Sequence, residues 1–298
     1  MKVNKMASAV AAALLGVQAH AVEPDPGTSG PLFVPMATGE NGWTPTTLFT
    51  VGETINGYTP YTPPGILDGL GAYELDEDTV RVLANHELLN FRGYSYYLDN
   101  NTSLKGARIS YFDIDKASRE IVDAGLAYHT IYDSTGVEVT DVSFLGEPFA
   151  TFDDEGPGDG EPLMGLSRLC SSQLVAPGEF KKGGVEDTIY FTGEEDGGGF
   201  NSIGGAEWAL DVDNNALWAV PAMGRGAWEN ITAVDIKQNG KVAFILADDS
   251  SPFDADDYAA EGDPNDTATE AAPLFLYIGE KEGEDFLGRN GLADGQLY

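Results

Sequence analysis

The side chain with the most distinctive chemistry in this chain is its only cysteine, Cys170. A lone thiol cannot form a disulfide within the chain, so Cys170 is a buried small hydrophobe, a reactive group or a metal ligand. Two neighbouring carboxylates, Glu194 and Glu195, follow at the end of the next predicted strand. Adjacent acids repel one another unless a cation or water separates them, so the metal ligand is the interpretation to test.

Other acids lie where predicted strands end or turns begin. Glu87 follows one apolar strand, Asp248 and Asp249 follow another, and Glu229 lies in a glycine-rich segment. An acid at the end of a buried strand is costly without a partner, which favours a functional interpretation. On a chain this acidic, a solvated surface position is the competing interpretation for each of them.

The scarcity of histidine limits the kind of metal site that the chain can build. Once a signal peptide is removed, only His86 and His129 are left, so a zinc site with three imidazoles is excluded. Oxygen ligands point to calcium, and a softer or redox metal fits only where Cys170 supplies sulfur. The sequence has no nucleophile-elbow, phosphate-loop or dinucleotide-binding motif, and Cys170 has no obvious base for thiol-protease chemistry.

The first 21 residues predict a secretory signal peptide. Lys2 and Lys5 precede a short apolar run, and Ala19-His20-Ala21 forms a small-residue cleavage site. No stretch reaches the roughly 18 apolar residues of a membrane-spanning helix, so we expect a periplasmic or secreted protein without membrane insertion. The net charge of −33 excludes nucleic acid as a partner and favours solubility, and we expect a monomer.

The remainder, residues 22–298, predicts one all-β domain. Short runs rich in β-branched and aromatic residues recur between clusters of Gly, Asn and Asp, which is typical of strands joined by turns. The predicted strands are 79–84, 108–114, 188–192, 208–212, 216–220, 241–246 and 274–278. Segments 153–161 and 254–272 are expected to be solvated loops, and segment 23–35 to be extended.

Irregular hairpin repeats with loop insertions favour a β-propeller over the alternative of a sandwich or jelly roll. The chain ends at residues 294–298 with a turn and the opening of a predicted strand. A closed propeller needs its last strand paired, so we expect a partial propeller whose C-terminal blades are missing.

The order of the motifs resembles that of the PhoX-type alkaline phosphatases, a family of exported bacterial phosphomonoesterases. The motifs that carry the resemblance are Asn-His-Glu at 85–87, the single Cys170, Thr-Gly-Glu-Glu at 192–195, Gly-Arg-Gly-Ala-Trp-Glu at 224–229 and the Asp pair at 248–249. The resemblance covers roughly residue 80 to the end. It implies a β-propeller that holds iron and calcium ions in its channel and hydrolyses small-molecule phosphate esters there.

Carried over residue by residue, the resemblance implies a set of metal ligands. Cys170 is similar to the cysteine that binds iron, and the acids implied with it are Glu87, Glu194, Glu195, Glu229, Asp248 and Asp249. The chain departs from the family pattern at Gly193 and Trp228, where Cys and His are common. The resemblance also implies that the basic residues that contact phosphate lie beyond Tyr298.

The expected function is therefore a metal-dependent phosphomonoesterase. The charge of the chain supports this expectation, since so negative a protein would repel an anionic ester unless cations gathered at the site. Two alternatives remain open: a non-catalytic exported propeller that binds calcium, and a phytase-like or lactonase-like propeller hydrolase.

Overall fold

The computed structural model describes residues 39–140, 165–195, 205–249 and 273–298. The predicted signal segment 1–21, the segment 23–35 and the loops 153–161 and 254–272 lie outside these residues. Across the described ranges, no helix has the length and apolar character needed to span a bilayer.

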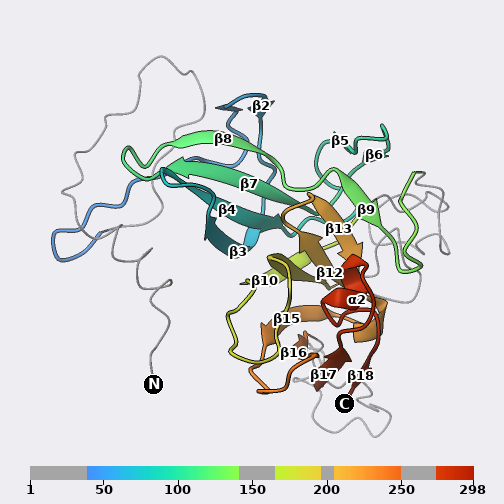
Figure 1. Cartoon of the computed structure of the whole chain (residues 1–298). Helices are drawn as coiled ribbons and strands as arrows, with labels where there is room; N and C mark the ends of the chain where they lie inside the picture. Colours follow the sequence, from blue (N-terminus) through green and yellow to red (C-terminus); the bar gives the residue numbers. More distant parts are fainter. Residues whose placement is uncertain (1–38, 141–164, 196–204, 250–272) are drawn as a thin grey trace, which may run out of the picture.

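The described residues form an all-β structure, as the sequence predicts. Their helical elements are the single-turn 3₁₀ helix η1 (Pro221–Met223) and the short helix α2 (Phe286–Arg289). Figure 1 shows three sheets that follow one another through the molecule, and every predicted strand coincides with or overlaps a strand of these sheets.

The first sheet has four antiparallel strands that are neighbours in chain order. They are β3 (Leu67–Glu74), β4 (Thr79–His86), β7 (Arg108–Asp115) and β8 (Ile121–Leu126). Two small hairpins accompany this sheet, formed by β1 (Ile55–Asn56) with β2 (Pro60–Tyr61) and β5 (Tyr96–Tyr97) with β6 (Ser103–Leu104). The chain-order topology arises because antiparallel strands can be joined by short turns.

The second sheet repeats this meander and adds strands at its margins. Its four antiparallel strands are β10 (Leu169–Val175), β11 (Ile189–Glu194), β12 (Gly205–Asp211) and β13 (Ala216–Ala219). The predicted hairpin of 208–212 with 216–220 is confirmed by the pairing of Leu210 with Leu217. At the margins, β9 (Thr130–Tyr132) runs parallel to β13, and β14 (Arg225–Gly226) pairs with the start of β12.

The third sheet is again a meander of four antiparallel strands. They are β15 (Trp228–Ala233), β16 (Lys241–Asp248), β17 (Leu274–Glu280) and β18 (Gly295–Leu297). The strand that the sequence predicts at its end is β18, and it pairs with β17 at the edge of this sheet.

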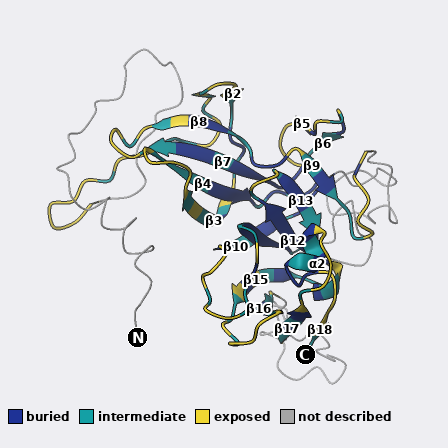
Figure 2. Ribbon diagram, in the orientation of Figure 1, coloured by how far each residue is buried: buried dark blue, intermediate teal, exposed yellow. Residues whose placement is uncertain are grey.

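The second sheet lies between two hydrophobic cores. Alternation along β12 sends Trp208 and Leu210 into the core shared with the first sheet, and Ala209 into the core shared with the third. All seven residues of β12 are therefore buried, and Figure 2 shows the central strands as the most deeply buried part of the molecule. A smaller apolar cluster, which includes Phe112, covers the other face of the first sheet beneath residues such as Phe49.

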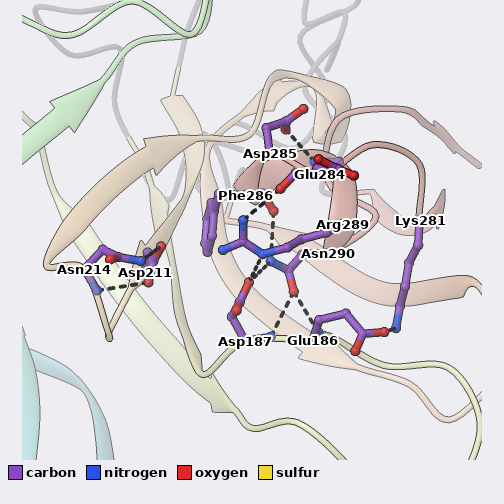
Figure 3. A network of polar contacts seen from close by, with 11 residues as sticks. Glu186, Asp187, Asp211, Asn214, Lys281, Glu284, Asp285, Phe286, Arg289 and Asn290 are labelled. Carbon is purple, nitrogen blue, oxygen red and sulfur yellow. Dashed lines mark hydrogen bonds and ion pairs between the residues drawn. The ribbon is translucent and has the colours of Figure 1, made fainter.

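A polar network around Asn290 fastens the third sheet to the second (Figure 3). The Asn290 amide oxygen accepts hydrogen bonds from the backbone amides of Glu186 (2.7 Å) and Asp187 (3.2 Å), and its Nδ2 donates to Asp187 Oδ2 at 2.6 Å. Arg289 donates to the same carboxylate oxygen at 2.6 Å. Because Asn290 is fully buried and its amide is bonded through both its oxygen and its nitrogen, we expect it to be costly to replace.

Candidate metal centre

The first two strands of each sheet share one pairing geometry. The paired residues are Leu67 with His86, Leu169 with Glu194, and Trp228 with Asp248, in the first, second and third sheet respectively. A register shift of the β-bulge type follows each pair directly. Bulges re-aim the side chains beside them, so the three sheets present the residues after each pair in a similar way.

A backbone hydrogen bond repeats beside each of these pairs. The amide that follows the second strand donates to the carbonyl that precedes the first strand, and the three bonds join Glu87 to Ile66 (2.9 Å), Glu195 to Arg168 (3.0 Å) and Asp249 to Ala227 (2.8 Å). The chain thus builds one local structure three times. The residues that follow the three pairs are Asp68 and Glu87, Cys170 and Glu195, and Glu229 and Asp249. We call these six residues the acid–thiol cluster.

The acid–thiol cluster forms because the first strands of the three sheets are neighbours. Strand β10 packs against both β3 and β15, and the Ser171 hydroxyl donates to the Glu229 carbonyl at 2.6 Å. The cluster contains two sets of possible ligand atoms, and within each set the atoms lie within 4.8 Å of one another. One set comes from Asp68, Glu87 and Cys170, and the other from Cys170, Glu195 and Glu229. Cys170 belongs to both sets, and the charge of Asp249 acts on Glu195 and Glu229.

Cys170 is buried at the centre of the cluster. Burial, the hydrogen bond to Glu195 and the charges of the neighbouring carboxylates raise the pKa of the thiol far above its usual range. Its Sγ donates to Glu195 Oε2 at 2.9 Å, as a protonated thiol can. A pKa this far above the usual range favours the protonated thiol, and a cation bound beside it would lower that pKa toward the thiolate.

The environment of the acids around Cys170 disfavours their charged form. Burial is the largest cause that raises the pKa of Glu195, Glu229 and Asp68, and neighbouring carboxylates raise each of them further. Asp249 acts in this way on both Glu195 and Glu229. Bringing a positive charge among these groups would relieve both the desolvation and the mutual repulsion.

Arg168 supplies one positive charge to the acid–thiol cluster. Its Nη2 lies 2.8 Å from Glu87 Oε1 and 2.5 Å from Glu195 Oε2, and its Nε donates to Glu87 Oε1 at 2.9 Å. The guanidinium therefore joins the acid of the first sheet to the acid of the second. Arg168 has a positive φ of 45°, a left-handed conformation that is uncommon for a residue other than glycine.

Two of the predicted site residues lie outside the cluster. Glu194 points to the opposite face of β11 from Glu195, as strand alternation predicts, and is completely buried. Its carboxylate accepts hydrogen bonds from the Ser167 amide (2.9 Å) and the Trp208 indole (3.3 Å), while burial raises its pKa to about 7. Asp248 accepts a hydrogen bond from the Ala227 amide at 2.9 Å and supports the turn before β15.

Several buried polar groups on neighbouring strands fix the backbone that carries Cys170. The Asn85 amide donates to the Cys170 carbonyl and to Thr192 Oγ1 (2.7 Å), and the Tyr190 hydroxyl donates to Asn85 Oδ1 at 3.0 Å. His86 does not contact Glu87, since its ring is bonded to the Gly65 carbonyl (3.1 Å) and to Ser110 (2.7 Å). Asn85 is thus the member of the Asn-His-Glu motif that positions Cys170.

Sequence reasoning missed Asp68 and Arg168. A signal for Asp68 exists in hindsight, because an apolar residue followed by a ligand opens the first strand of each sheet: Leu67-Asp68, Leu169-Cys170 and Trp228-Glu229. Arg168 carries no such signal, since the residues at its position in the other two sheets are Ile66 and Ala227.

The donor set fits metal ions. Ligand oxygens lie about 2.3–2.6 Å from calcium. The atoms of each set lie within 4.8 Å of one another, so they are close enough to share one ion. Carboxylate oxygens suit a hard cation such as calcium, and the one sulfur suits a softer or redox metal such as iron.

Comparisons of the chain with protein-family models, with curated proteins and with solved structures find no match. The geometry of the acid–thiol cluster and the order of its motifs therefore carry the functional assignment.

Proposed function

We propose that the protein is an exported, metal-dependent phosphomonoesterase whose reaction centre is the acid–thiol cluster. The observation that carries this proposal is the threefold local structure. Five of its six residues belong to the two sets of possible ligands, and the charge of the sixth, Asp249, acts on Glu195 and Glu229. Surface acids on a solvated protein have no reason to repeat in register or to surround a buried thiol. The repetition favours a site over a chance gathering of charge.

We also propose that the three sheets are blades of a β-propeller within residues 22–298. Each is a four-stranded antiparallel meander, and the first strand of the second sheet packs against the first strands of both others. Blades of a propeller have this arrangement, with their first strands around a central channel. In that architecture the acid–thiol cluster lies at the channel.

The metal assignment follows ligand chemistry. Iron is proposed at the position that Cys170 ligates together with Glu195, and calcium where oxygen alone is available, as between Glu229 and Asp249. Bound cations would neutralise the phosphoryl oxygens, orient the ester and stabilise the charge that develops during hydrolysis. The protein itself contributes rigid placement, since Asn85 and Ser171 hold the backbone on which the ligands stand.

The proposal is tested by metal analysis and turnover measured on the same samples. The chain is expressed with its export signal, its iron and calcium contents are determined, and hydrolysis of p-nitrophenyl phosphate is followed. In Cys170→Ser we expect weaker iron binding, with less iron in the purified protein, and a fall in turnover of about 100-fold or more, because the ligand sulfur is gone. The matched control is Glu186→Gln, which removes an exposed acid paired with Lys281 in the network of Figure 3.

The outcomes separate the three functions. Loss of iron and of turnover in Cys170→Ser alone supports the phosphomonoesterase. Melting that depends on calcium, without hydrolysis of any phosphate ester, identifies a non-catalytic calcium-binding propeller. Hydrolysis of phytate but not of p-nitrophenyl phosphate identifies a phytase-like enzyme, and lactone hydrolysis a lactonase-like one.

A further inference from the structure

Arg168 makes its contacts with two of the carboxylates that would bind metal. Glu87 belongs to the first set of possible ligands and Glu195 to the second, and Nη2 of Arg168 is within ion-pair distance of both. A bidentate or bridging guanidinium is the strongest partner that a protein can offer a carboxylate pair. A metal ion bound by these carboxylates therefore competes with the guanidinium for their negative charge.

The threefold local structure shows that Arg168 is an addition to the site rather than part of its framework. The backbone carbonyl of Arg168 makes the same hydrogen bond as the carbonyls of Ile66 and Ala227 in the other two sheets. Neither of those side chains carries a charge, so the turn needs no arginine. Arg168 is also only partly buried, with 34% of its side chain exposed, so it can move toward solvent without unfolding the strand.

We propose that Arg168 is an internal counter-cation that competes with metal for the acid–thiol cluster. In the metal-free protein the guanidinium neutralises Glu87 and Glu195 and keeps the cluster assembled. Loading of the Cys170-centred site breaks both ion pairs and displaces the side chain toward solvent. This inference rests on the proposed function, since it concerns how the same site is filled.

Competition of this kind has two linked consequences. Removing the guanidinium strengthens metal binding, because the ligand oxygens become free and a positive charge beside the ion is lost. Removing it also weakens the metal-free protein, because the buried carboxylates then repel one another without compensation. A residue with only a structural role would lower stability without raising metal affinity.

The test compares Arg168→Gln with Arg289→Gln in the full chain. Arg289 is a matched control: its side chain is 34% exposed and pairs with a 21% exposed carboxylate, as Arg168 does with Glu87, but it lies in the network around Asn290. Calcium and, under argon, ferrous iron are each titrated into protein stripped with a chelator, with calorimetry for affinity and thermal melting for stability. Arg168→Lys is included because it keeps the positive charge but loses the planar guanidinium, which can donate to two carboxylates at once.

For Arg168→Gln we expect metal affinity at least about tenfold higher than wild type and a lower melting temperature without metal. Arg168→Lys should fall between the two, and Arg289→Gln should leave metal affinity unchanged. Equal affinity in wild type and Arg168→Gln would overturn the competition while leaving the metal centre intact. Absence of metal binding in both, with Arg289→Gln folded, would overturn the metal centre as well. Should Arg168→Gln fail to fold, the metal affinities of Arg168→Lys and wild type are compared instead. Equal affinities in these two proteins would overturn the competition.

Discussion

Metal binding at Cys170 must release a proton, and this prediction can be measured without knowing the substrate. Burial and the surrounding carboxylates keep the Cys170 pKa far above its usual range, which favours the protonated thiol. A metal ion binds sulfur as the thiolate. One proton must therefore leave Cys170 for each site that it ligates, and the perturbation to make is Cys170→Ser, which removes the titrating group.

The size of the pH dependence of metal affinity follows from the number of protons released on binding. When one proton is released, the apparent affinity rises about tenfold per pH unit, which corresponds to about 1.4 kcal/mol. The range to use is pH 7 to 9. Both proteins keep the same carboxyls there, so a difference between them comes from the thiol. Across this range, affinity for ferrous iron should rise about 100-fold in the wild type and stay nearly flat in Cys170→Ser.

Calorimetry in two buffers of different ionisation enthalpy gives the number of protons directly. The wild type should release about one proton more per bound iron than Cys170→Ser. Calcium bound by oxygen alone should release no such proton in either protein, and it serves as the internal control. Equal proton release by wild type and Cys170→Ser would refute the assignment of the sulfur as a ligand.

Three further predictions concern stability. Gly193→Ala should lower the free energy of unfolding by about 2–3 kcal/mol, because a Cβ there would overlap the Trp228 backbone carbonyl, as denaturant titration can show. Burial raises the Glu207 pKa to about 8, so stability should fall as pH rises from about 4.5 to 8, and Glu207→Gln should flatten this dependence. Asn290→Ala should lower the free energy of unfolding by about 2–3 kcal/mol in a urea titration, since it removes the hydrogen bonds to the Glu186 and Asp187 backbone amides and to the Asp187 carboxylate.

Each of these predictions has a control within the chain. Gly65→Ala adds a Cβ that meets open space and should change stability little, and so should Asn214→Ala at an exposed turn. A Gly193→Ala protein as stable as Gly65→Ala would contradict the close packing of β11 on β15. For Glu207, the sign is set by its raised pKa: the folded state holds the proton that the unfolded state has lost, and stability that rises between pH 5 and 8 would contradict it.

The strands were predictable from the sequence because alternation is a local property. The pattern around Trp208 and Leu210 requires only neighbouring residues to be recognised, and the hairpin to Leu217 follows from the turn between them. Strand β10 packs between β3 and β15, which begin at Leu67 and Trp228, far from Leu169 in the sequence, and no local pattern encodes this packing. The sequence therefore predicted an all-β chain more firmly than the arrangement of its sheets.

The candidate site was predictable in part for the same reason. Strand-end position identified Glu87 and Glu195 as possible partners of Cys170, and the glycine-rich segment 224–229 identified Glu229. The structure brings all three beside Cys170. Glu194 and Glu195 are neighbours in the sequence but point to opposite faces of the sheet. Which of the two faces Cys170 depends on the register of the strand. Arg168 was missed because an ion pair that spans two sheets leaves no trace in local spacing.

The most direct test of the account is a crystal structure of the protein loaded with iron and calcium, with anomalous difference maps recorded on both sides of the iron absorption edge. The account predicts an iron peak within bonding distance of Cys170 Sγ and of a Glu195 oxygen, with calcium beside it between Glu229 and Asp249, and Arg168 turned away from Glu87. Ions bound elsewhere, with the Cys170 thiol still donating to Glu195, would contradict it.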